Sequence, residues 1–443
     1  MGKGPFSASF DPANGFVYVP NWGSDNVSVI RGTSIIASVG VGVSPTSATY
    51  DGNNGLVYVS NNDGRNVSVL RGTTWVGSVR VGWGPFFVTV DPENGYVYVP
   101  NSGTNNVSII NATSVVASLD VGSAPWLATY DPDNGYVYVP NGESDSVSVI
   151  NGTTLVGTVS VGISPIFAVY DDDDGLVYVS DHNSGTVSVL RGLTVLANVS
   201  VGDGPWLPTY DPANGCVYVP NQGGSNVTVI RGTSPVGSVD VGNAPHSIVY
   251  DSGNGQLYVT GGSSAVTIIN GTAVAGSLSV GADPTYSVYD NETGDVYVPN
   301  YASDNVSVFA TPASYSVAFT EYGLPSGTPW QVELSSGQSF SSTSETFSFL
   351  APNGTYTYSV SANGFASPGG QFTVSGSNAG PVPVSFATAP TRSSGLSSLD
   401  YLAVGGVVLV VATIAFLLYY RRRRHGPKPP IRPDAPSGPR GSQ

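Results

Sequence analysis

The sequence predicts an all-β protein whose first 311 residues repeat one unit of four short strands. Three observations lead to this prediction. A turn that begins with aspartate and ends with glycine recurs at a spacing of 40 residues six times and 39 residues once. Between these turns valine and serine alternate with a period of two, which is typical of strands with one buried face. No helical period occurs before residue 400. The turns begin at Asp11, Asp51, Asp91, Asp131, Asp171, Asp211, Asp251 and Asp290.

The third copy shows the four strands of the unit. They are expected at Phe86–Val90, Tyr96–Pro100, Asn106–Ile110 and Val115–Val121, joined by turns that contain Pro and Gly. Four antiparallel strands in about 40 residues, repeated many times, are typical of a β-propeller. One such unit cannot bury both of its faces alone, so the units are expected to pack around an axis. The count of innermost strands favours eight blades, with seven as the alternative if one terminal copy is not incorporated.

A short motif on the second strand of each unit carries a resemblance to a known family. The motif reads "YVPN", "YVSN" or "YVTG", and it stands at Tyr18, Tyr58, Tyr98, Tyr138, Tyr218, Tyr258 and Tyr297. Together with the period and the turn, it resembles the YVTN-family propeller repeat of bacterial exported proteins and archaeal surface-layer proteins. The resemblance covers roughly residues 1–311. It implies a propeller and an archaeal cell-surface protein, but it implies no reaction.

The eighth copy lacks its fourth strand. The chain passes from Asn305–Phe309 into a different pattern, whereas "MGKGP" at Met1 aligns with "VGWGP" at Val81, where every other copy begins with valine. A GTG codon encodes valine internally and is read as methionine at a start. We therefore expect a start upstream of Met1, with a signal peptide and an outer strand that completes the eighth blade. The alternative is a genuine start and a three-stranded last blade.

A second domain and a membrane anchor are expected after the propeller. Residues 315–388 predict a small Ig-like β-sandwich that serves as a spacer, and its "PNGTYTYSV" stretch resembles a module of exported archaeal proteins. Residues 389–401 read as a linker. The 19 uncharged residues 402–420 predict a transmembrane helix of ~28 Å. The arginines that follow place residues 421–443 in the cytoplasm as a disordered basic tail, so the propeller is extracellular.

The charge distribution excludes one class of partner. Residues 1–398 hold 28 acidic and 8 basic residues, whereas residues 399–443 hold 2 and 7. A phosphate backbone would be repelled by this acidic body, so no nucleic-acid partner is expected.

The single cysteine, Cys216, stands where other copies carry Phe, Leu or Tyr, and it reads as a small apolar filler. No disulfide can form within one chain.

No catalytic or metal set is visible in the pattern. The histidines are His182, His246 and His425, and two of them on nonadjacent units do not make a metal site. The acidic run at Asp171–Asp174 replaces an ordinary turn, and a solvated turn is favoured over a Ca²⁺ site. We expect no cofactor, no metal and no enzymatic activity. The alternative function is an envelope enzyme, of the propeller lyase or hydrolase type, with its site at the channel mouth.

Large side chains in the loops that enter the first strands, and in one loop after a second strand, indicate a binding face. Both kinds of loop lie on the same face of a propeller, where aromatic residues on a rigid scaffold suit a protein or glycan partner. Packing between blades is the other interpretation, favoured about equally. The leading prediction is a binding or envelope-organising scaffold anchored in the membrane. The candidate binding residues are Trp22, Trp83, Phe86, Trp126, Ile166, Trp206 and His246.

The sequence also predicts N-glycosylation, because sequons Asn-x-Ser/Thr recur throughout the expected outer part. Many of them are written by the repeat itself, where a turn leads into an "NVS" or "NVT" strand. Asn111, Asn151 and Asn270 are different, since sister copies carry arginine at this turn. The candidate sites are Asn26, Asn66, Asn106, Asn111, Asn151, Asn198, Asn226, Asn270, Asn291, Asn305 and Asn353.

Overall fold

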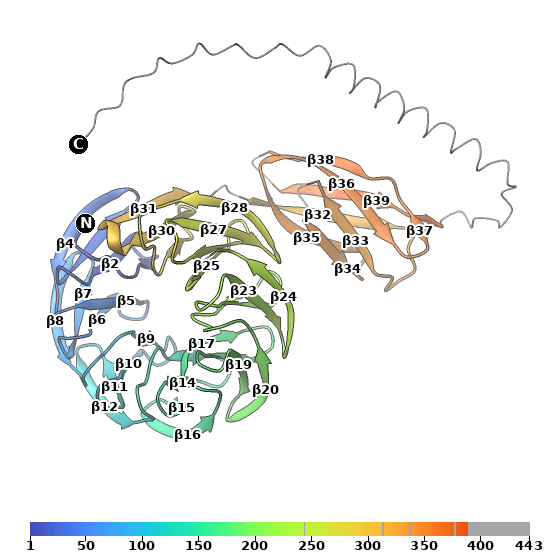
Figure 1. Cartoon of the computed structure of the whole chain (residues 1–443). Helices are drawn as coiled ribbons and strands as arrows, with labels where there is room; N and C mark the ends of the chain where they lie inside the picture. The colour runs from blue at the N-terminus through green and yellow to red at the C-terminus, as the bar shows by residue number, and fades with distance from the viewer. Residues whose placement is uncertain (243, 312–313, 336–337, 376–377, 389–443) are drawn as a thin grey trace, which may run out of the picture.

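The computed structural model describes residues 1–242, 244–311, 314–335, 338–375 and 378–388. These residues form two β-sheet bodies, a ring of sheets and a smaller sandwich (Figure 1). The predicted linker 389–401, membrane helix 402–420 and tail 421–443 lie outside the described residues. Within the described part of the chain, no helix has the length and apolar character needed to cross a membrane.

Residues 1–311 form seven four-stranded antiparallel sheets and one three-stranded sheet, arranged around a common axis (Figure 1). Each four-stranded sheet runs in chain order from an inner first strand to an outer fourth strand. This confirms the all-β class and the repeated four-stranded unit, and it is consistent with a β-propeller. The first strands are β1 (Ser9–Asp11), β5 (Pro45–Asp51), β9 (Thr89–Val90), β13 (Thr129–Asp131), β17 (Pro165–Asp171), β21 (Thr209–Asp211), β25 (Ser247–Asp251) and β29 (Val288–Asp290). The second strands are β2 (Phe16–Asn21), β6 (Leu56–Asn61), β10 (Tyr96–Asn101), β14 (Tyr136–Asn141), β18 (Leu176–Asp181), β22 (Cys216–Pro220), β26 (Gln256–Thr260) and β30 (Asp295–Asn300).

The third and fourth strands make the outer half of each sheet. The third strands are β3 (Asn26–Arg31), β7 (Asn66–Arg71), β11 (Asn106–Asn111), β15 (Ser146–Asn151), β19 (Thr186–Arg191), β23 (Asn226–Arg231), β27 (Ala265–Asn270) and β31 (Asn305–Ala310). The fourth strands are β4 (Ser34–Gly40), β8 (Thr74–Arg80), β12 (Ser114–Asp120), β16 (Thr154–Ser160), β20 (Thr194–Ser200), β24 (Ser234–Asp240) and β28 (Ala273–Ser279). In the last sheet a short 3₁₀ helix, η1 (Tyr301–Ser303), precedes β31, and no fourth strand follows β31 within the described residues.

The length of each first strand depends on one residue of the second strand, with which it pairs. The third copy was expected to have a first strand at residues 86–90, but β9 covers only Thr89–Val90. Its partner β10 carries Pro100, which has no N–H to extend the ladder. Where serine or threonine replaces this proline, the pairing continues, as in Ser47 with Ser60 and Ser247 with Thr260. In the copies with proline, the residues between the loop and the first strand are therefore not paired in the ladder. These residues line the axis.

The repeated aspartate holds the turn between the first and second strands. In the first turn the Asp11 carboxylate accepts hydrogen bonds from the Ala13 N–H at 2.9 Å and from the Asn14 side-chain amide at 2.7 Å. Gly15, at φ 70°, occupies the left-handed region that glycine favours, and its N–H donates to the Asp11 carbonyl oxygen. Asp11 is only 2 % exposed although the turn is at the surface. The recurring letters thus encode an aspartate-capped turn.

The core is divided into layers between neighbouring sheets. The tyrosine of the "YV" motif is buried in every copy. Tyr98, for example, reaches across to the next sheet, where its hydroxyl donates to the Gly152 carbonyl oxygen over 3.0 Å. Thr89 makes a similar bond to the Ala128 carbonyl oxygen at 2.7 Å. Cys216 is buried in one of these layers, as the sequence predicted. The motif is therefore a device that fixes one sheet against the next.

The first and last sheets meet at the axis. Ser7 forms a parallel bridge with Tyr286, and the Ala8 N–H donates to the Tyr286 carbonyl oxygen at 3.1 Å. The Gly4 N–H donates to the Asp304 carboxylate at 2.8 Å. Apolar side chains of both sheets, Val17 and Tyr297 among them, share one core cluster. The ring is thus continuous on its inner side.

The second body consists of two sheets that face each other as a β-sandwich. One sheet has the order β35–β32–β39, and the other has the order β34–β33–β36–β37–β40, with β38 also paired to β36. Both sheets contribute to one aromatic core that contains Trp330 and Phe319. The strands are β32 (Ser314–Tyr322), β33 (Trp330–Leu334), β34 (Ser339–Ser342), β35 (Thr346–Pro352), β36 (Gly354–Ala362), β37 (Phe365–Ala366), β38 (Gly370–Val374), β39 (Ala379–Ser385) and β40 (Ala387–Thr388).

Candidate functional site

The candidate site lies where the loops that enter the first strands reach the axis. Each loop ends in a proline, and the two residues that follow it lie in successive positions toward the first strand. The first of these two positions holds Phe6, Thr46, Phe86, Trp126, Ile166, Trp206, His246 and Thr285. The second holds Ser7, Ser47, Phe87, Leu127, Phe167, Leu207, Ser247 and Tyr286. The large side chains come mainly from the first, third, fourth, fifth, sixth and last sheets, and they form one apolar cluster.

Edge-to-face and tilted ring contacts connect this cluster around the axis. Phe86 contacts Phe6, Trp22 and Trp126, with ring centroids 5.5, 6.3 and 5.4 Å apart. Phe167 continues the chain of contacts to Trp206 at 5.2 Å. Such geometries are the favoured ones for aromatic pairs and contribute about 0.5–1.5 kcal/mol each beyond burial. We call this connected set, with Phe87, His182, His246, Tyr286 and Tyr301, the axial aromatic cluster.

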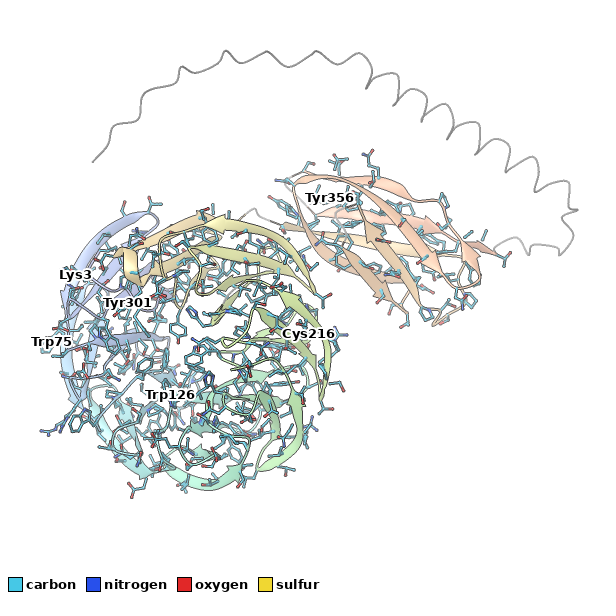
Figure 2. The ribbon with its side chains drawn as sticks, in the orientation of Figure 1. Lys3, Trp75, Trp126, Cys216, Tyr301 and Tyr356 are labelled. Carbon is cyan, nitrogen blue, oxygen red and sulfur yellow. The ribbon has the colours of Figure 1, made fainter. Side chains whose placement is uncertain are left out.

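The cluster has a sealed layer and a half-buried layer. Phe167 and Ile166 are 0 % and 4 % exposed, so their role in this structure is packing. Trp22, Phe86, Trp126 and Trp206 keep part of their surface accessible. Figure 2 places Trp126 inside the ring, whereas Trp75 lies at the circumference. Both interpretations of the sequence therefore apply, packing for the deeper side chains and an accessible face for the others.

Polar atoms are embedded in the half-buried layer. The Trp206 Nε1–H donates to the Tyr286 hydroxyl oxygen over 3.1 Å. His182 contacts the Trp206 ring at 5.2 Å, and its Nδ1 lies 3.3 Å from the Pro205 carbonyl oxygen. His246 contacts the Tyr286 ring, and burial lowers the pKa of its imidazole. Burial likewise raises the pKa of Tyr286 to about 12. Burial therefore favours the neutral forms of the His246 imidazole and the Tyr286 phenol between the rings.

One side of the axis is polar instead of aromatic. The Ser7 hydroxyl donates to the Thr46 carbonyl oxygen at 2.8 Å. Ser60, the serine that replaces proline in its copy, bonds to Ser47 and to the Phe86 carbonyl oxygen, each at 2.8 Å. These hydroxyls are buried and satisfied, so they hold the second sheet against the first and the third rather than offer a free site.

Trp83 is not part of the axial aromatic cluster. Its ring is 50 % exposed, and the Arg65 guanidinium carbon lies 3.6 Å from the ring centroid, a cation–π contact. Val43 and Ile163, at the same loop position in other sheets, are also about half exposed. The structure therefore assigns the predicted binding residues to two places. Trp22, Phe86, Trp126, Ile166, Trp206 and His246 gather at the axis, whereas Trp83 stands on the loop rim.

The acidic run at Asp171–Asp174 folds as the turn seen in the other copies. The Asp171 carboxylate accepts hydrogen bonds from the N–H groups of Asp173 at 3.0 Å and Asp174 at 3.3 Å. In the described ranges, no group of three or more His, Cys, Asp or Glu side chains is placed to hold a metal ion. Asp171 is thus committed to its own turn.

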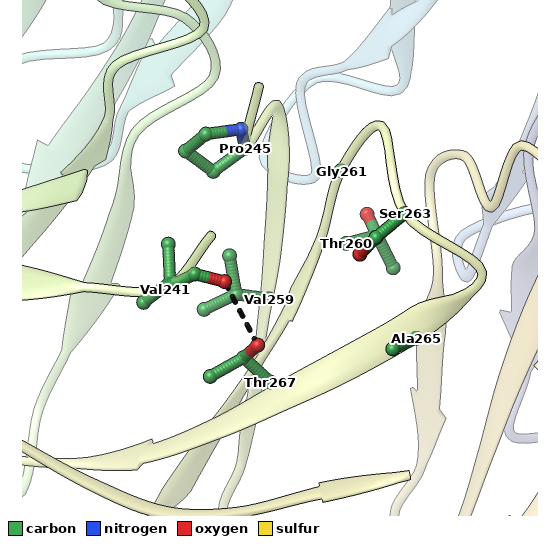
Figure 3. Close-up of a pocket in the computed structure, with 8 residues that line it drawn as sticks. All are labelled: Val241, Pro245, Val259, Thr260, Gly261, Ser263, Ala265 and Thr267. Carbon is green, nitrogen blue, oxygen red and sulfur yellow. Dashed lines mark hydrogen bonds between the residues drawn. The ribbon is translucent and has the colours of Figure 1, made fainter. Parts of the chain in front are cut away.

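A small cavity marks the copy that is one residue shorter. Six of the other seven copies place an asparagine at the end of the second strand, where its amide binds the side chain that begins the third strand, as Asn61 binds Asn66 at 2.8 Å. The seventh copy has Gly261 and Ala265 at these positions, and the Thr267 hydroxyl bonds to the Val241 carbonyl oxygen at 3.0 Å (Figure 3). The cavity left there has a volume of ≈ 10 Å³, which is about the room that one water needs.

Sequence reasoning missed one buried acid. Asp181 stands where other copies have Asn21, Asn61, Asn101 or Asn141, and it is 0 % exposed. Burial raises the pKa of its carboxyl to about 6, against the hydrogen bonds from Ser188 and Thr186 that favour the charged form. Within the described residues its Oδ1 atom has no partner. An alignment of the eight copies shows this asparagine-to-aspartate change directly, so the signal was present in the letters.

The predicted glycosylation sites fall into two structural groups. Asn26, Asn66, Asn106, Asn226 and Asn305 accept a hydrogen bond from the asparagine that ends the second strand. The amide nitrogens of Asn106 and Asn226 also donate to the fourth strand. Asn111 and Asn151 are exposed, and Asn270 is partly exposed, at the turn between the third and fourth strands. Asn198, Asn291 and Asn353 are exposed.

Comparisons with known proteins place the chain among β-propellers by structure. The solved structures similar to residues of this chain include hydrazine synthase of Kuenenia stuttgartiensis (19 % identity, TM-score 0.51, covering 70 % of this chain and 96 % of that one). They also include the dihydro-heme d1 dehydrogenase NirN (14 %, TM-score 0.56, covering 66 % and 69 %). A third is the C-terminal WD40 domain of Sif2 (12 %, TM-score 0.58, covering 70 % and 97 %). Neither a protein-family model nor a curated protein matches the sequence.

These similarities correct one prediction. The sequence was interpreted as that of a protein without enzymatic activity, and this conclusion is wrong, because two of the similar structures are enzymes. At identities below 20 % the similarity shows the fold alone, and the fold does not decide between an enzyme and a scaffold.

Proposed function

We propose that this chain is a membrane-anchored cell-surface protein whose propeller binds a protein or glycan partner through the half-buried layer of the axial aromatic cluster. The observation that carries the proposal is the connected array of Trp22, Phe86, Trp126 and Trp206. Its rings keep accessible surface although they are fixed by one another. Rigid aromatic side chains lose little conformational entropy on binding, and they are frequent among the residues that dominate binding energy.

The wider assignment rests on the sequence. In this proposal the ring is an eight-bladed propeller of the YVTN type, as found on archaeal cell surfaces. The uncharged run 402–420, followed by Arg421–Arg424, supports a single membrane span with the propeller outside and the tail in the cytoplasm. The sandwich 315–388 would hold the propeller away from the membrane. The low content of charged residues, 10 %, suits a glycosylated surface in an envelope.

The second candidate is an envelope enzyme that acts at the same face. Three groups with exchangeable protons, His182, His246 and the Tyr286 hydroxyl, lie within the axial aromatic cluster. A neutral imidazole beside a phenol can serve general acid–base chemistry when a substrate is within hydrogen-bonding distance. Both candidates therefore predict that the same residues matter, and turnover separates them.

The test compares the purified full chain with two variants on glycan arrays and on envelope proteins. Trp126→Ala combined with Trp206→Ala should weaken binding at least tenfold, because each large ring removed from such a face costs about 1–3 kcal/mol. Trp75→Ala is the matched control, since Trp75 is 52 % exposed at the circumference. Unchanged binding by the double variant, with a lower melting temperature, would show that the rings serve packing only. Chemical conversion of a bound glycan would favour the enzyme.

A further inference from the structure

The face that carries the axial aromatic cluster is acidic. Two sets of loops make up this face, those that enter the first strands and those that join the second strands to the third. Together they hold seven acidic side chains and two basic ones. The acidic residues are Asp25, Asp63, Glu143, Asp145, Asp203, Asp283 and Asp304, and the basic residues are Lys3 and Arg65. Such an excess of negative charge attracts cationic groups and repels anionic ones.

Four of these carboxylates hold the loops themselves in place. Asp25, Asp145 and Asp304 each accept a hydrogen bond from a backbone N–H of a neighbouring loop, at 2.8 or 2.9 Å. Asp63 accepts a hydrogen bond from the Ser44 hydroxyl at 2.8 Å. These four are therefore committed to the structure of the face.

The other three carboxylates are unpaired and border the cluster. Glu143, Asp203 and Asp283 are exposed, and within the described residues their carboxylates have neither a hydrogen-bond nor an ion-pair partner. Glu143 follows the glycine against which the Trp126 indole packs. Asp203 stands three residues before Trp206 in the same loop. Two of the half-buried indoles thus have an unpaired acid beside them in the chain or in space.

Asp283 borders the cluster from the last sheet. Its carbonyl oxygen accepts a hydrogen bond from the Tyr301 N–H at 2.8 Å, and the Tyr301 ring contacts Phe6. Burial lowers the pKa of the His246 imidazole, and the nearby charge of Asp283 opposes this effect. Asp283 is therefore close enough to the cluster to act on it electrostatically.

The same loops already hold one guanidinium against an indole, that of Arg65 at 3.6 Å from the Trp83 ring centroid. A guanidinium is planar and more weakly hydrated than an ammonium. It can lie on an aromatic ring while its N–H groups donate to a carboxylate. Half-exposed indoles with unpaired carboxylates at their border offer both contacts at once.

We propose that the half-buried layer of the axial aromatic cluster, bordered by Glu143, Asp203 and Asp283, is the receptor site for an arginine side chain of a partner protein. The inference rests on the proposed function, because it assigns the chemistry of the partner bound at the same face. The guanidinium stacks on an indole of this layer and donates to a bordering carboxylate. A lysine ammonium fits less well, since it is strongly hydrated and does not stack.

The test compares two peptides that differ in one charge. Acetyl-Gly-Arg-Gly-amide and its citrulline counterpart have nearly the same shape, but citrulline is neutral. In calorimetric titration of the full chain, the arginine peptide should bind at least tenfold more tightly at low salt. The difference should shrink at ~1 M salt, where the screening length is about 3 Å. Equal binding of the two peptides, or binding of neither, would overturn the inference.

Amide substitutions remove the bordering charges without altering an aromatic ring. Glu143→Gln, Asp203→Asn and Asp283→Asn together should weaken binding of the arginine peptide at least tenfold. Binding of the citrulline peptide should stay the same. The melting temperature should also stay the same, because these side chains are exposed and, within the described residues, unpaired.

The matched control is Glu93→Gln with Asp172→Asn and Glu292→Gln. It changes the net charge by the same amount at exposed turns between first and second strands, at the other end of the sheets. Equal weakening by both triple variants would show that net charge alone acts, which would also overturn the inference. The proposed function has a separate readout in Trp126→Ala with Trp206→Ala. If that double variant loses its partner while arginine and citrulline peptides bind equally, the binding face stands and the arginine site is rejected.

Discussion

The indole Nε1–H of Trp206 donates a hydrogen bond to the hydroxyl oxygen of Tyr286 over 3.1 Å. This bond joins two sheets that have one other sheet between them. Trp206 follows the loop into the sixth sheet, whereas Tyr286 follows the loop into the last. The Tyr286 ring also contacts Phe6, Phe87 and His246, with centroids 5.4 to 5.9 Å apart. Tyr286 is therefore the point where the axial aromatic cluster is tied to the junction of the first and last sheets.

Trp206→Phe should destabilise the propeller more than loss of ring area alone predicts. The substitution keeps an aromatic ring but removes the donor, so the buried Tyr286 hydroxyl loses its partner, at a cost of about 1–3 kcal/mol in the free energy of unfolding. Tyr286→Phe removes the acceptor of the same bond and should cost a similar amount, because the two atoms are 3.1 Å apart in the same layer. Denaturant unfolding of the two variants and of the double variant gives the coupling energy. A coupling energy near zero would mean that this hydrogen bond does not contribute to stability.

Asp181→Asn should stabilise the chain at neutral pH. The side chain is buried, and its carboxyl has a pKa raised to about 6, whereas the unfolded chain ionises near the model value of 3.8. The unfolded state thus loses its proton first, and the wild-type free energy of unfolding falls as pH rises from about 4 to about 6. The asparagine variant lacks this decline and makes the bond that Asn61 makes to Ser68. We expect a gain of about 1–3 kcal/mol at pH 7.

Urea unfolding of both proteins at pH 4 and pH 7 measures this effect. The difference between the two proteins should be small at pH 4 and should grow by pH 7. Asn141→Asp, which places an acid at the same position of the fourth sheet, is the matched reverse change and should introduce the same loss. A pH-independent difference would show that the pKa of Asp181 is not raised in the folded state.

Much of the fold could be predicted because each copy encodes its own turns and strands locally. Asp11, Gly15 and the alternating strand that follows them are enough to define one hairpin, and the repeat multiplies the evidence. The exception was the first strand of the third copy, which was predicted too long. The missing information was in Pro100 on the partner strand, since ladder pairing depends on both strands. The alternation of side chains along one strand gives no information about the strand it pairs with.

The location of the candidate site could be predicted from the sequence, but which of its side chains are buried could not. Loops of the same kind lie on one face by topology, so the meeting of Trp22, Trp126 and Trp206 follows from the repeat. Which of the rings is sealed depends on packing across the axis between sheets far apart in the chain, and no local pattern encodes it. Tyr286 was overlooked because it occupies the second position after the loop proline, and the shorter seventh copy shifts its spacing by one residue.

Alkaline pH should unfold the propeller over a range set by its buried tyrosines. Burial raises the pKa of Tyr18, Tyr98 and Tyr138 to about 12, whereas the unfolded chain ionises near 10. The unfolded state therefore releases protons first, and the free energy of unfolding falls as pH rises above 10.

Tyr98→Phe loses the bond to the Gly152 carbonyl oxygen, so it should be less stable at pH 7 by about 1 kcal/mol. Its decline above pH 10 should be shallower than that of the wild type in thermal melts. A parallel decline would show that Tyr98 does not contribute to the alkaline transition.

Glycans should be found on Asn111, Asn151 and Asn270 and not on Asn106 or Asn226. The first three lie at the turn between the third and fourth strands, where two are exposed and the third is partly exposed. Asn106 and Asn226 use their amide nitrogens to bond to Ser118 and Ser238 at 3.1 and 2.8 Å, so a sugar on that nitrogen would break a contact between strands. Mass spectrometry of peptides from the native protein measures occupancy at each site.

Asn111→Gln is the control, because it should remove one glycan and leave the melting temperature unchanged apart from the effect of that glycan. Modified Asn106 or Asn226 would contradict the structural distinction, and unmodified asparagine at all three turn positions would leave turn chemistry as the reason that the repeat writes these sequons.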